Sequence, residues 1–553
     1  MDNLFGENTE ILENKADMEQ DVPESVANQE KQMDEIMLKS LDSYRRRTGS
    51  TSIGREKLFQ LSLQEASKIV TSTQPNEVEM EDALNKLILR KKVKEFVIDG
   101  MKYYSKTSDE QNESKLIAEL KSFFQREKSL NVLSSDLSEQ IKKEVKSEGI
   151  SLSNEQENAV KTALISPVSI ITGGPGCGKT LTANVIIKVA KRMKNDAKII
   201  LAAPTGKAAM RLKELTGMPA QTIQSLVEYR PQDDYWYLWP NSISADLLII
   251  DEVSMLDLYF TYRVFYMTAP TTRIILIGDP DQLPSIKAGA VLRDMMNSGI
   301  IPVSSLCHCY RQTSGAEEII SVANAIKAQH RIGIFPLPIN TTLKDSVHFI
   351  QTEQADDIHT RILEVVKQLH ADLGYSYKQI QVLTPVNSKS WGAEALNEEL
   401  RRMINSRHVN ENDFWEGDRV ICTKNIPNPT NPSEKIVVNG ELGEIVSVIG
   451  EKLTIQFEKK KITLSAGKVS LAYALSVHRA QGSEYPVVIV PLCNEMWSLL
   501  SRPVLYTALT RAKEKVVIIG SAKDIMQAVR TDVNAERLTV FSQRLKSELK
   551  SIA

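Results

Sequence analysis

A run of small residues between Gly173 and Thr180 has the composition and spacing of a phosphate-binding loop. It reads Gly-Gly-Pro-Gly-Cys-Gly-Lys-Thr, which fits G-x-x-x-x-G-K-T. Glycines let successive backbone N–H groups converge on phosphate oxygens, and the positive end of a following helix adds to the attraction. Lys179 would reach the β- and γ-phosphates, and the Thr180 hydroxyl would hold Mg²⁺. The loop predicts a site for a nucleoside triphosphate.

Two adjacent carboxylates further along the chain add the chemistry of hydrolysis. The apolar run 247–250 ends in Asp251 and Glu252. Asp251 can hold Mg²⁺ through water, and Glu252 can polarise the attacking water as a general base. The pair predicts that the nucleotide is hydrolysed as well as bound.

Three more polar residues could act on the γ-phosphate. Gln282 lies in the segment Gly-Asp-Pro-Asp-Gln-Leu-Pro, where it could sense the loss of that phosphate. Arg311 and Arg511 lie in two later segments, Tyr-Arg-Gln and Leu-Thr-Arg-Ala. Two arginines from a second α/β domain can stabilise transition-state charge across a cleft. These residues predict a catalytic site shared by two domains.

Strand-like and helix-like segments alternate around these residues from about residue 151 onward. The phosphate loop is expected between a buried strand at 168–171 and a helix at 181–193. Further strands are expected at 198–203, 247–250, 273–277, 379–383, 487–491 and 516–519. This alternation predicts an α/β fold with parallel sheets. Residues 417–469 differ, because short β-like runs joined by Pro-rich and Gly turns predict an inserted β-barrel.

The first 150 residues are expected to contain two parts. Residues 1–40 hold 11 Asp/Glu and 3 Lys and show no apolar periodicity, so residues 1–45 are predicted to be a disordered acidic tail. Residues 46–150 are predicted to form a small helical domain, in which a helix at 79–92 precedes a hairpin at 93–105. Helix and hairpin together resemble a winged helix. Such a module binds nucleic acid or serves only for packing, and the sequence leaves both open.

The composition excludes several classes of protein. The 553 residues are 42% apolar and 25% charged, and no run of 18 uncharged apolar residues suggests a membrane span. The N-terminus lacks the features of a secretion signal, and five cysteines without C-x-x-C spacing suit a reducing cytosol, so a cytoplasmic protein is expected. Residues 41–553 carry a net charge of +6, which is compatible with a nucleic-acid groove.

Eight ordered motifs resemble those of superfamily 1 helicases, and within them the RecD-like, 5′-to-3′ branch. The matching segments are the Q motif at 154–156, motif I at 173–180, motif Ia at 203–209, motif II at 251–255, motif III at 278–284, motif IV at 310–312, motif V at 472–484 and motif VI at 506–513. The resemblance spans residues 151–545 and more faintly 80–150. Motif V departs from the family's usual His-Lys-Ser-Gln-Gly, because Arg479 and Ala480 replace its Lys and Ser.

The resemblance implies two RecA-like lobes, at 151–300 and at 301–416 plus 470–553, with ATP and Mg²⁺ between them. It implies catalytic roles for Lys179, Asp251, Glu252, Gln282, Arg311 and Arg511, and metal binding by Thr180 and Asp251. Nucleotide contacts are implied for Gln156, Gly173, Gly174, Pro175, Gly176, Cys177, Gly178, Lys179, Thr180, Gly482 and Glu484. Nucleic-acid contacts are implied for Pro204, Thr205, Lys207, Trp236, Ser476 and His478.

Two insertions are also implied by the resemblance. Residues 228–244 would form a β-hairpin that splits the duplex, with Trp236 among the aromatic side chains that could stack on bases. Packing of these aromatics onto the first lobe is the alternative. Residues 417–469 would be an SH3-like barrel that clamps single-stranded DNA.

The expected function is that of an ATP-dependent DNA helicase. It would move 5′ to 3′ on single-stranded DNA and unwind duplex DNA in repair or recombination. A superfamily 1 RNA helicase is one alternative, because the motifs contact phosphates and do not exclude ribose. An ATP-switch subunit of a nuclease or recombination complex is another. No protein partner is predicted.

Overall fold

The computed structural model describes residues 24–69, 74–130, 134–227, 241–308, 316–329, 343, 345–352, 355–388, 391–405, 414–428, 435–458 and 460–551. They belong to two compact units, Met1–Gln111 and Asn112–Ala553. Three expectations lie outside the described residues: the roles of Arg311 and Trp236, and residues 228–240 of the hairpin expected at 228–244. No helix in the described ranges is long and apolar enough to cross a membrane.

Unit 1 combines three helices with a small antiparallel sheet of strand order β1-β3-β2. Its elements are α1 (Glu24–Thr48), β1 (Ser52–Gly54), α2 (Arg55–Ile69), α3 (Glu77–Leu89), β2 (Val93–Ile98) and β3 (Met101–Lys106). The predicted hairpin is confirmed, because β2 and β3 pair directly up to Ile98 and Met101. Asp99 and Gly100 between them both have positive φ, as a two-residue turn requires.

The prediction of a disordered tail through residue 45 is wrong for residues 24–45, which form most of α1. Ile36, Met37 and Leu41 of this helix are buried, and the last two share a core with Leu58 and Leu84 of α2 and α3. Apolar residues therefore recur at helical spacing within an acidic segment. The acidic composition obscured this pattern in the sequence.

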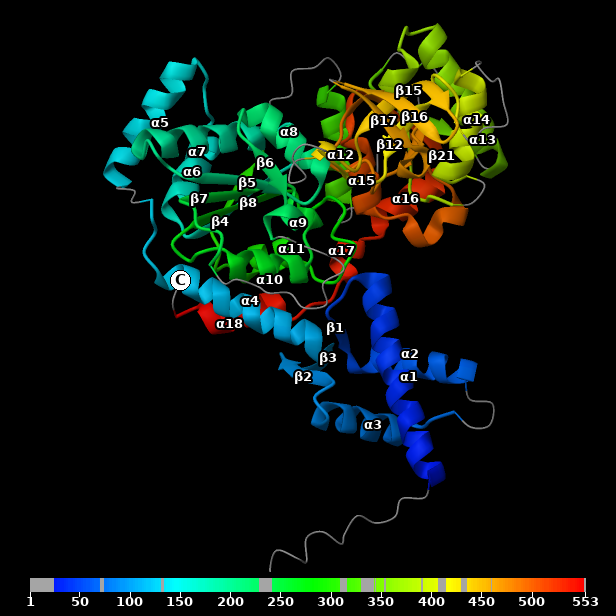
Figure 1. The fold of residues 1–553 in the computed structure, drawn as a ribbon. Helices are drawn as coiled ribbons and strands as arrows, with labels where there is room; N and C mark the ends of the chain where they lie inside the picture. The colour runs from blue at the N-terminus through cyan, green and yellow to red at the C-terminus, as the bar shows by residue number, and fades with distance from the viewer. Residues whose placement is uncertain are drawn as a thin grey trace, which may run out of the picture. The chain divides into compact units, whose positions relative to one another are not determined.

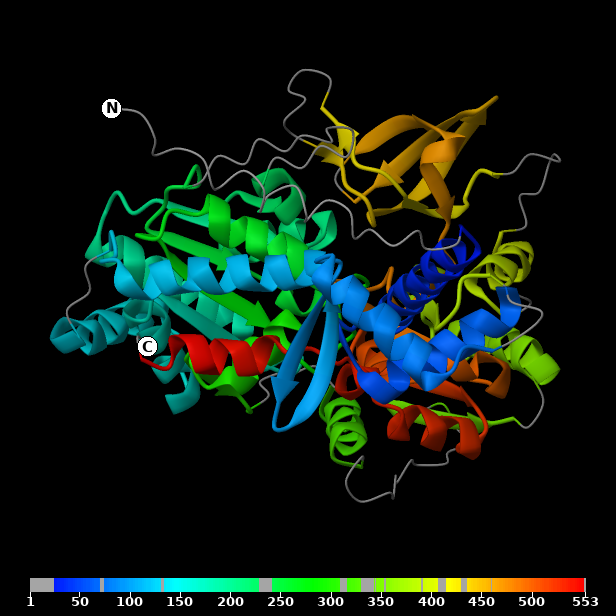
Figure 2. The same cartoon turned by 90° about the horizontal axis from the view of Figure 1, so that it is seen from below.

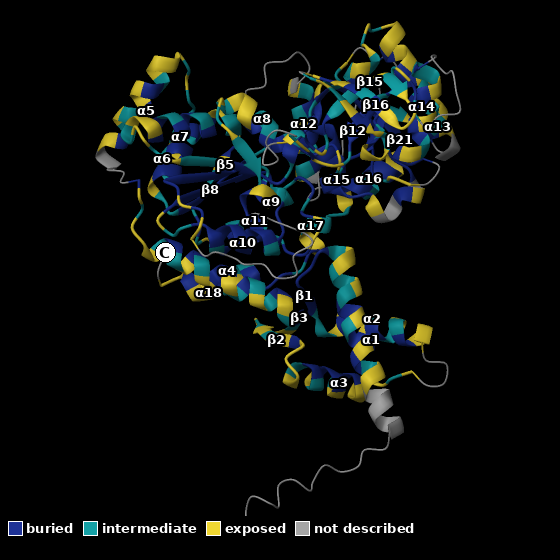
Figure 3. Cartoon of the chain, viewed as in Figure 1, coloured by how far each residue is buried: buried dark blue, intermediate teal, exposed yellow. Residues whose placement is uncertain are grey.

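Lobe one of unit 2 has a six-stranded parallel sheet of order β6-β5-β7-β8-β4-β9. Its strands are β4 (Val168–Gly173), β5 (Ile199–Ala203), β6 (Ala220–Thr222), β7 (Leu247–Ile250), β8 (Arg273–Gly278) and β9 (Val303–Leu306). One face carries α6 (Asn154–Ile165) and α7 (Lys179–Met193), and the other carries α10 (Leu258–Met267) and α11 (Val291–Ser298) (Figure 1). The central strands are buried between these layers (Figure 3).

Three predicted domain boundaries need correction. Residues 301–306 were expected in the second lobe, but β9 pairs with β4 in the sheet of lobe one. Residues 112–150 were expected in the N-terminal domain, but α4 (Thr107–Gln125) from residue 112 onward and α5 (Ser134–Glu148) bury apolar side chains in the cores of lobe one. The C-terminal α18 (Phe541–Leu549) likewise packs there instead of in lobe two.

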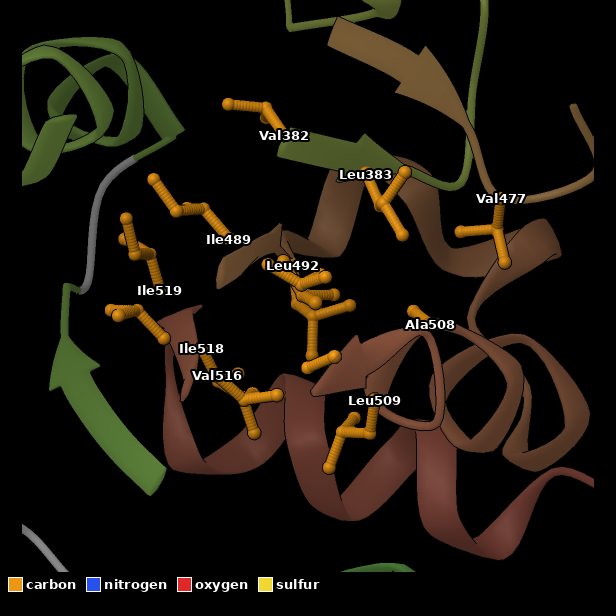
Figure 4. Packing of buried hydrophobic residues seen from close by; sticks show 14 of the residues in the cluster. Val382, Leu383, Val477, Ile489, Leu492, Ala508, Leu509, Val516, Ile518 and Ile519 are labelled. Carbon is orange, nitrogen blue, oxygen red and sulfur yellow. The ribbon is translucent and has the colours of Figure 1, made fainter. Parts of the chain in front are cut away.

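Lobe two has a five-stranded parallel sheet of order β10-β21-β20-β11-β19. Its strands are β10 (Val347–Gln351), β11 (Ile380–Thr384), β19 (Ala474–Ser476), β20 (Tyr485–Pro491) and β21 (Ala512–Gly520). Its helices are α12 (Ala316–Gln329), α13 (Ala355–Ala371), α14 (Ala393–Ile404), α15 (Arg502–Leu509) and α16 (Ala522–Arg530). Val382, Ile489 and Ile518 point into its aliphatic core (Figure 4). The predicted α/β class with parallel sheets is confirmed in both lobes.

The segment inserted into lobe two contains an antiparallel sheet of order β17-β16-β15-β12-β18 (Figure 2). Its strands are β12 (Arg419–Cys422), β15 (Leu442–Ile449), β16 (Lys452–Phe457), β17 (Lys461–Ser465) and β18 (Val469–Leu471). The short β-like runs expected over residues 417–469 are therefore present as strands. Two short strands, β13 (Ile426–Pro427) and β14 (Lys435–Val437), pair separately. The insertion therefore has its own core, distinct from that of the parallel sheet.

Candidate nucleotide site and nucleic-acid groove

The phosphate loop joins β4 to α7 with the geometry that the sequence predicted. Gly178 stands at the N-cap of α7 with a φ of 81°. A Cβ on Gly173 would lie 2.6 Å from the carbonyl oxygen of Leu306, so only glycine fits against β9. Lys179 Nζ donates hydrogen bonds to the carbonyl oxygens of Gly173 and Gly174, at 2.6 and 2.8 Å. The ammonium group is thus held at the loop, where phosphate oxygens would bind.

A cavity of about 400 Å³ lies against this loop and is lined by both lobes. Lobe one contributes loop residues 175–181, Asp251, Glu252 and Gln282. Lobe two contributes Gly482, Glu484 and Arg511. Most residues expected at the nucleotide site are therefore brought together from distant parts of the chain.

Asp251 and Glu252 follow β7 at the edge of the sheet. The Asp251 carboxylate accepts a hydrogen bond from the backbone N–H of Glu252 at 2.8 Å, and Glu252 adopts left-handed backbone angles. Burial, with the neighbouring Glu252 charge second, raises the pKa of Asp251 to about 6. A cation beside these oxygens would favour the ionised form. Asp251 and Thr180 both line the cavity and supply the oxygen ligands that Mg²⁺ prefers, so this donor set fits the ion.

Arg511 is almost fully buried at the lobe-two side of the cavity. Its guanidinium donates to the carbonyl oxygens of Thr507 and Ser483, at 3.2 and 3.3 Å, and these contacts aim it at the cavity. Glu484 lies 3.0 Å from the guanidinium of Arg211, which belongs to α8 (Gly206–Thr216) of lobe one. Sequence reasoning missed Arg211, although it lies one helical turn after Lys207 of motif Ia.

Gln156 lies apart from the cavity lining. Its carboxamide oxygen accepts the backbone N–H of Ser153 at 3.0 Å, which completes the cap of α6. Its amide nitrogen donates to the carbonyl oxygen of Cys177 at 3.4 Å. Gln156 therefore supports the phosphate loop through the Cys177 backbone. Its expected contact with adenine stays a prediction.

The two lobes meet at the loop that follows β8. The buried Tyr506 hydroxyl of α15 donates to the Asp279 carboxylate at 2.9 Å. The backbone N–H of Leu283 donates to the Thr507 hydroxyl at 2.9 Å, and Gln481 donates to the Leu283 carbonyl oxygen at 3.3 Å. Lobe two thus holds the segment that carries Gln282, and the sequence did not predict these bonds.

A second cavity, of about 530 Å³, lies between lobe one, lobe two and the inserted sheet. Four of the residues expected to contact nucleic acid line it: Pro204, Thr205, Lys207 and His478. Ser476 is buried and is not part of this lining. Burial, with the charge of Arg419 second, lowers the pKa of Lys207 to about 8. We refer to this cavity as the groove.

Glycine at position 206 lets lobe one approach the inserted segment closely. A Cβ on Gly206 would lie 2.6 Å from the Cβ of Val438, which follows β14. Cys422 and Asn439 line the same groove from the inserted segment. The width of the groove therefore depends on this contact.

Comparison with known proteins gives matches in both lobes. Residues 156–288 match the family model of an AAA domain, and residues 471–519 match that of the UvrD-like helicase C-terminal domain. The ATP-dependent RecD2 DNA helicase of Deinococcus radiodurans is 32% identical over 404 residues, which cover 72% of this chain and 53% of that protein. The chain thus spans about half the length of this relative.

Other relatives are matched over more of their length. The RecBCD enzyme subunit RecD of Mycolicibacterium smegmatis is 28% identical over 433 residues, covering 71% of this chain and 75% of that protein. A solved structure of Pif1 helicases at forked DNA is 19% identical, covers 72% of this chain and 98% of that one, and has a TM-score of 0.44. The sequence matches and the ordered motifs make this chain similar to the RecD-like superfamily 1 helicases.

Proposed function

We propose that this chain is an ATP-dependent DNA helicase that moves 5′ to 3′ along single-stranded DNA and unwinds duplex DNA. The observation that carries this proposal is that the nucleotide cavity and the groove share three chain segments. In α8, Lys207 lines the groove and Arg211 lines the nucleotide cavity. In motif V, His478 lines the groove and Glu484 lines the nucleotide cavity.

The third shared segment is the loop after β8. Gln282 lines the nucleotide cavity, and Ile286, four residues later, lines the groove. Loss of the γ-phosphate would therefore act directly on segments that also contact the nucleic acid, with no other structural element between the two sites. The contacts to the nucleic acid would then differ between the ATP-bound and the ATP-free protein. Such a difference is what shifts the equilibrium between conformations that bind the strand tightly and weakly.

The chemistry at the nucleotide follows from the residues of both lobes. Lys179 and the loop N–H groups would bind the phosphates, and Mg²⁺ held by Thr180 and Asp251 would neutralise charge on them. Glu252 would orient and deprotonate the attacking water, and Arg511 would stabilise charge in the transition state. Arg311 is proposed for the same role on sequence grounds.

The smaller modules are assigned by the same reasoning. We propose that the inserted segment is an SH3-like module, because it forms a small five-stranded antiparallel sheet with its own core. We propose that it contacts single-stranded DNA, because its residues Cys422, Thr423 and Asn425 line the groove together with motif Ia. Unit 1 is proposed to be a winged-helix module on the basis of its element order and its β1-β3-β2 sheet. A role in DNA repair or recombination is proposed from the similarity to the RecD-like helicases.

Unwinding assays with tailed substrates test the proposal. We expect faster unwinding of a duplex with a 5′ single-stranded tail than of one with a 3′ tail, and no unwinding with the Lys179→Ala variant. Preference for the 3′ tail would refute the assigned polarity. Equal or faster unwinding of the matching RNA duplex would favour the RNA helicase, and ATP turnover without any unwinding would favour the ATP-switch subunit.

A further inference from the structure

The cations around the hairpin of unit 1 divide into two groups. Those of the first group are held in ion pairs: Arg90 with Asp34, Lys102 with Glu95, and Lys106 with Asp42. The second group consists of Lys91, Lys92 and Lys94, which are exposed. None of these three lies within ion-pair distance of a carboxylate in the described part of the chain. Their charge is therefore available to an outside ligand.

The three lysines occupy a short stretch next to partly exposed aromatic side chains. Lys91 and Lys92 form the turn between α3 and β2, and Lys94 is the second residue of β2. Side chains alternate along a strand, so Lys94 shares one face of the hairpin with Phe96 and with Tyr103, the cross-strand partner of Phe96. Both rings are partly exposed. Basic and aromatic groups thus occur together on this face.

The neighbouring helix has the opposite charge. Helix α3 carries Glu77, Glu79, Glu81 and Asp82 against the single cation Lys86, which pairs with Asp82 at 2.6 Å. Arg55 of α2 pairs with Glu77 and Glu81, so the four carboxylates still outnumber the two cations that face them. A helix of this charge would be repelled by phosphates in a DNA groove. A polyanion that approaches unit 1 would therefore be directed to the turn and hairpin and away from α3.

We infer that the turn and hairpin at 91–103 form a second DNA-binding site, which holds the phosphodiester backbone of duplex DNA through Lys91, Lys92 and Lys94. Three cations within four residues suit a duplex, which carries about one negative charge per 1.7 Å of its axis. Contacts to phosphates carry no sequence information, so binding here is independent of sequence. This site is made of residues other than those of the groove in unit 2.

Binding of a blunt duplex to the full-length chain, measured by anisotropy over a range of salt concentrations, tests this site. The variant is Lys92→Gln/Lys94→Gln, which leaves Lys91 and its left-handed backbone unchanged. The control is Lys57→Gln/Lys68→Gln, which removes two exposed lysines from α2 of the same unit. We expect about a tenfold loss of duplex affinity and a salt slope shallower by about 1.8 in the hairpin variant only.

Three results would overturn the inference. Parental duplex affinity in the hairpin variant would show that no site exists there. Equal losses in the hairpin and control variants would show only an effect of overall charge. A loss of binding to a single strand but not to the duplex would assign the site to single strands. ATPase stimulated by a single strand is measured alongside and should be unchanged, so failure of the proposed helicase function is seen separately.

Discussion

Replacing Tyr506 by Phe removes one hydroxyl from the contact between the lobes and nothing else. The Tyr506 hydroxyl donates its hydrogen bond to the Asp279 carboxylate, and both residues are only 1% exposed. Burial, followed by the charge of Asp279, raises the pKa of Tyr506 well above its usual value, so the hydroxyl stays protonated and donates. In the variant, Asp279 keeps the backbone N–H of Asp281 at 3.1 Å.

The size of the effect follows from the kind of bond. A hydrogen bond to a charged group contributes about 1.5–3 kcal/mol, and about 1.4 kcal/mol corresponds to a tenfold change in an equilibrium or a rate. The Phe variant should therefore weaken this contact by roughly 10- to 100-fold. Because the loop that carries Gln282 is held by the same lobe, we expect DNA-stimulated kcat to fall by a similar factor, with nucleotide binding to the phosphate loop unchanged.

Tyr473→Phe is the matched control. The buried Tyr473 hydroxyl donates to the Asp418 carboxylate at 3.1 Å, but this pair lies between lobe two and its insertion, away from the lobe–lobe contact. Steady-state ATPase with saturating single-stranded DNA is measured for both variants, together with their thermal stability. A parental kcat for Tyr506→Phe, or equal losses of kcat in the two variants, would refute the reasoning.

Three other perturbations follow from the structure. Gly206→Ala should weaken single-strand binding about tenfold, because its Cβ would lie 2.6 Å from that of Val438. Adding Val438→Gly should restore the affinity, and an equilibrium titration that finds no such rescue would refute the assigned clash. Lys207 has its pKa lowered to about 8, and a phosphate favours its charged form, so single-strand affinity should fall as pH rises from about 7 to 9. The always-charged Lys207→Arg variant should lose that dependence, and an unchanged pH profile would exclude Lys207 as its source. Met37→Ala should destabilise unit 1 by about 2–5 kcal/mol, since Met37 is fully buried, and calorimetry that finds parental unfolding would show that α1 is not part of the core.

Features defined by local patterns could be predicted from the sequence. The phosphate loop, the strand before it and the hairpin turn at Asp99 and Gly100 depend on residues a few positions apart. The pair Asp251 and Glu252 was recognisable because an apolar strand precedes it. In each case the chemistry and the backbone geometry are determined by the same short segment.

Features that depend on distant partners could not be predicted in this way. The hydrogen bond between Tyr506 and Asp279 joins residues 227 positions apart, and the sequence around either residue does not identify the other as its partner. Helix α18 is amphipathic, but its apolar face does not reveal that it packs in lobe one. The ion pair of Arg211 could not be predicted for the same reason, because its partner Glu484 belongs to the other lobe.

The claim that both lobes build one catalytic site is tested most directly by measuring ATP turnover. The parent protein, Lys179→Ala and Arg511→Ala are each measured with and without single-stranded DNA. Lys179 belongs to lobe one and Arg511 to lobe two, and both line the same cavity. We expect the parent's turnover to rise when DNA is added, and both variants to lose more than a hundredfold, about 2.7 kcal/mol, with or without DNA. Parental turnover by Arg511→Ala in the presence of DNA would contradict the shared site.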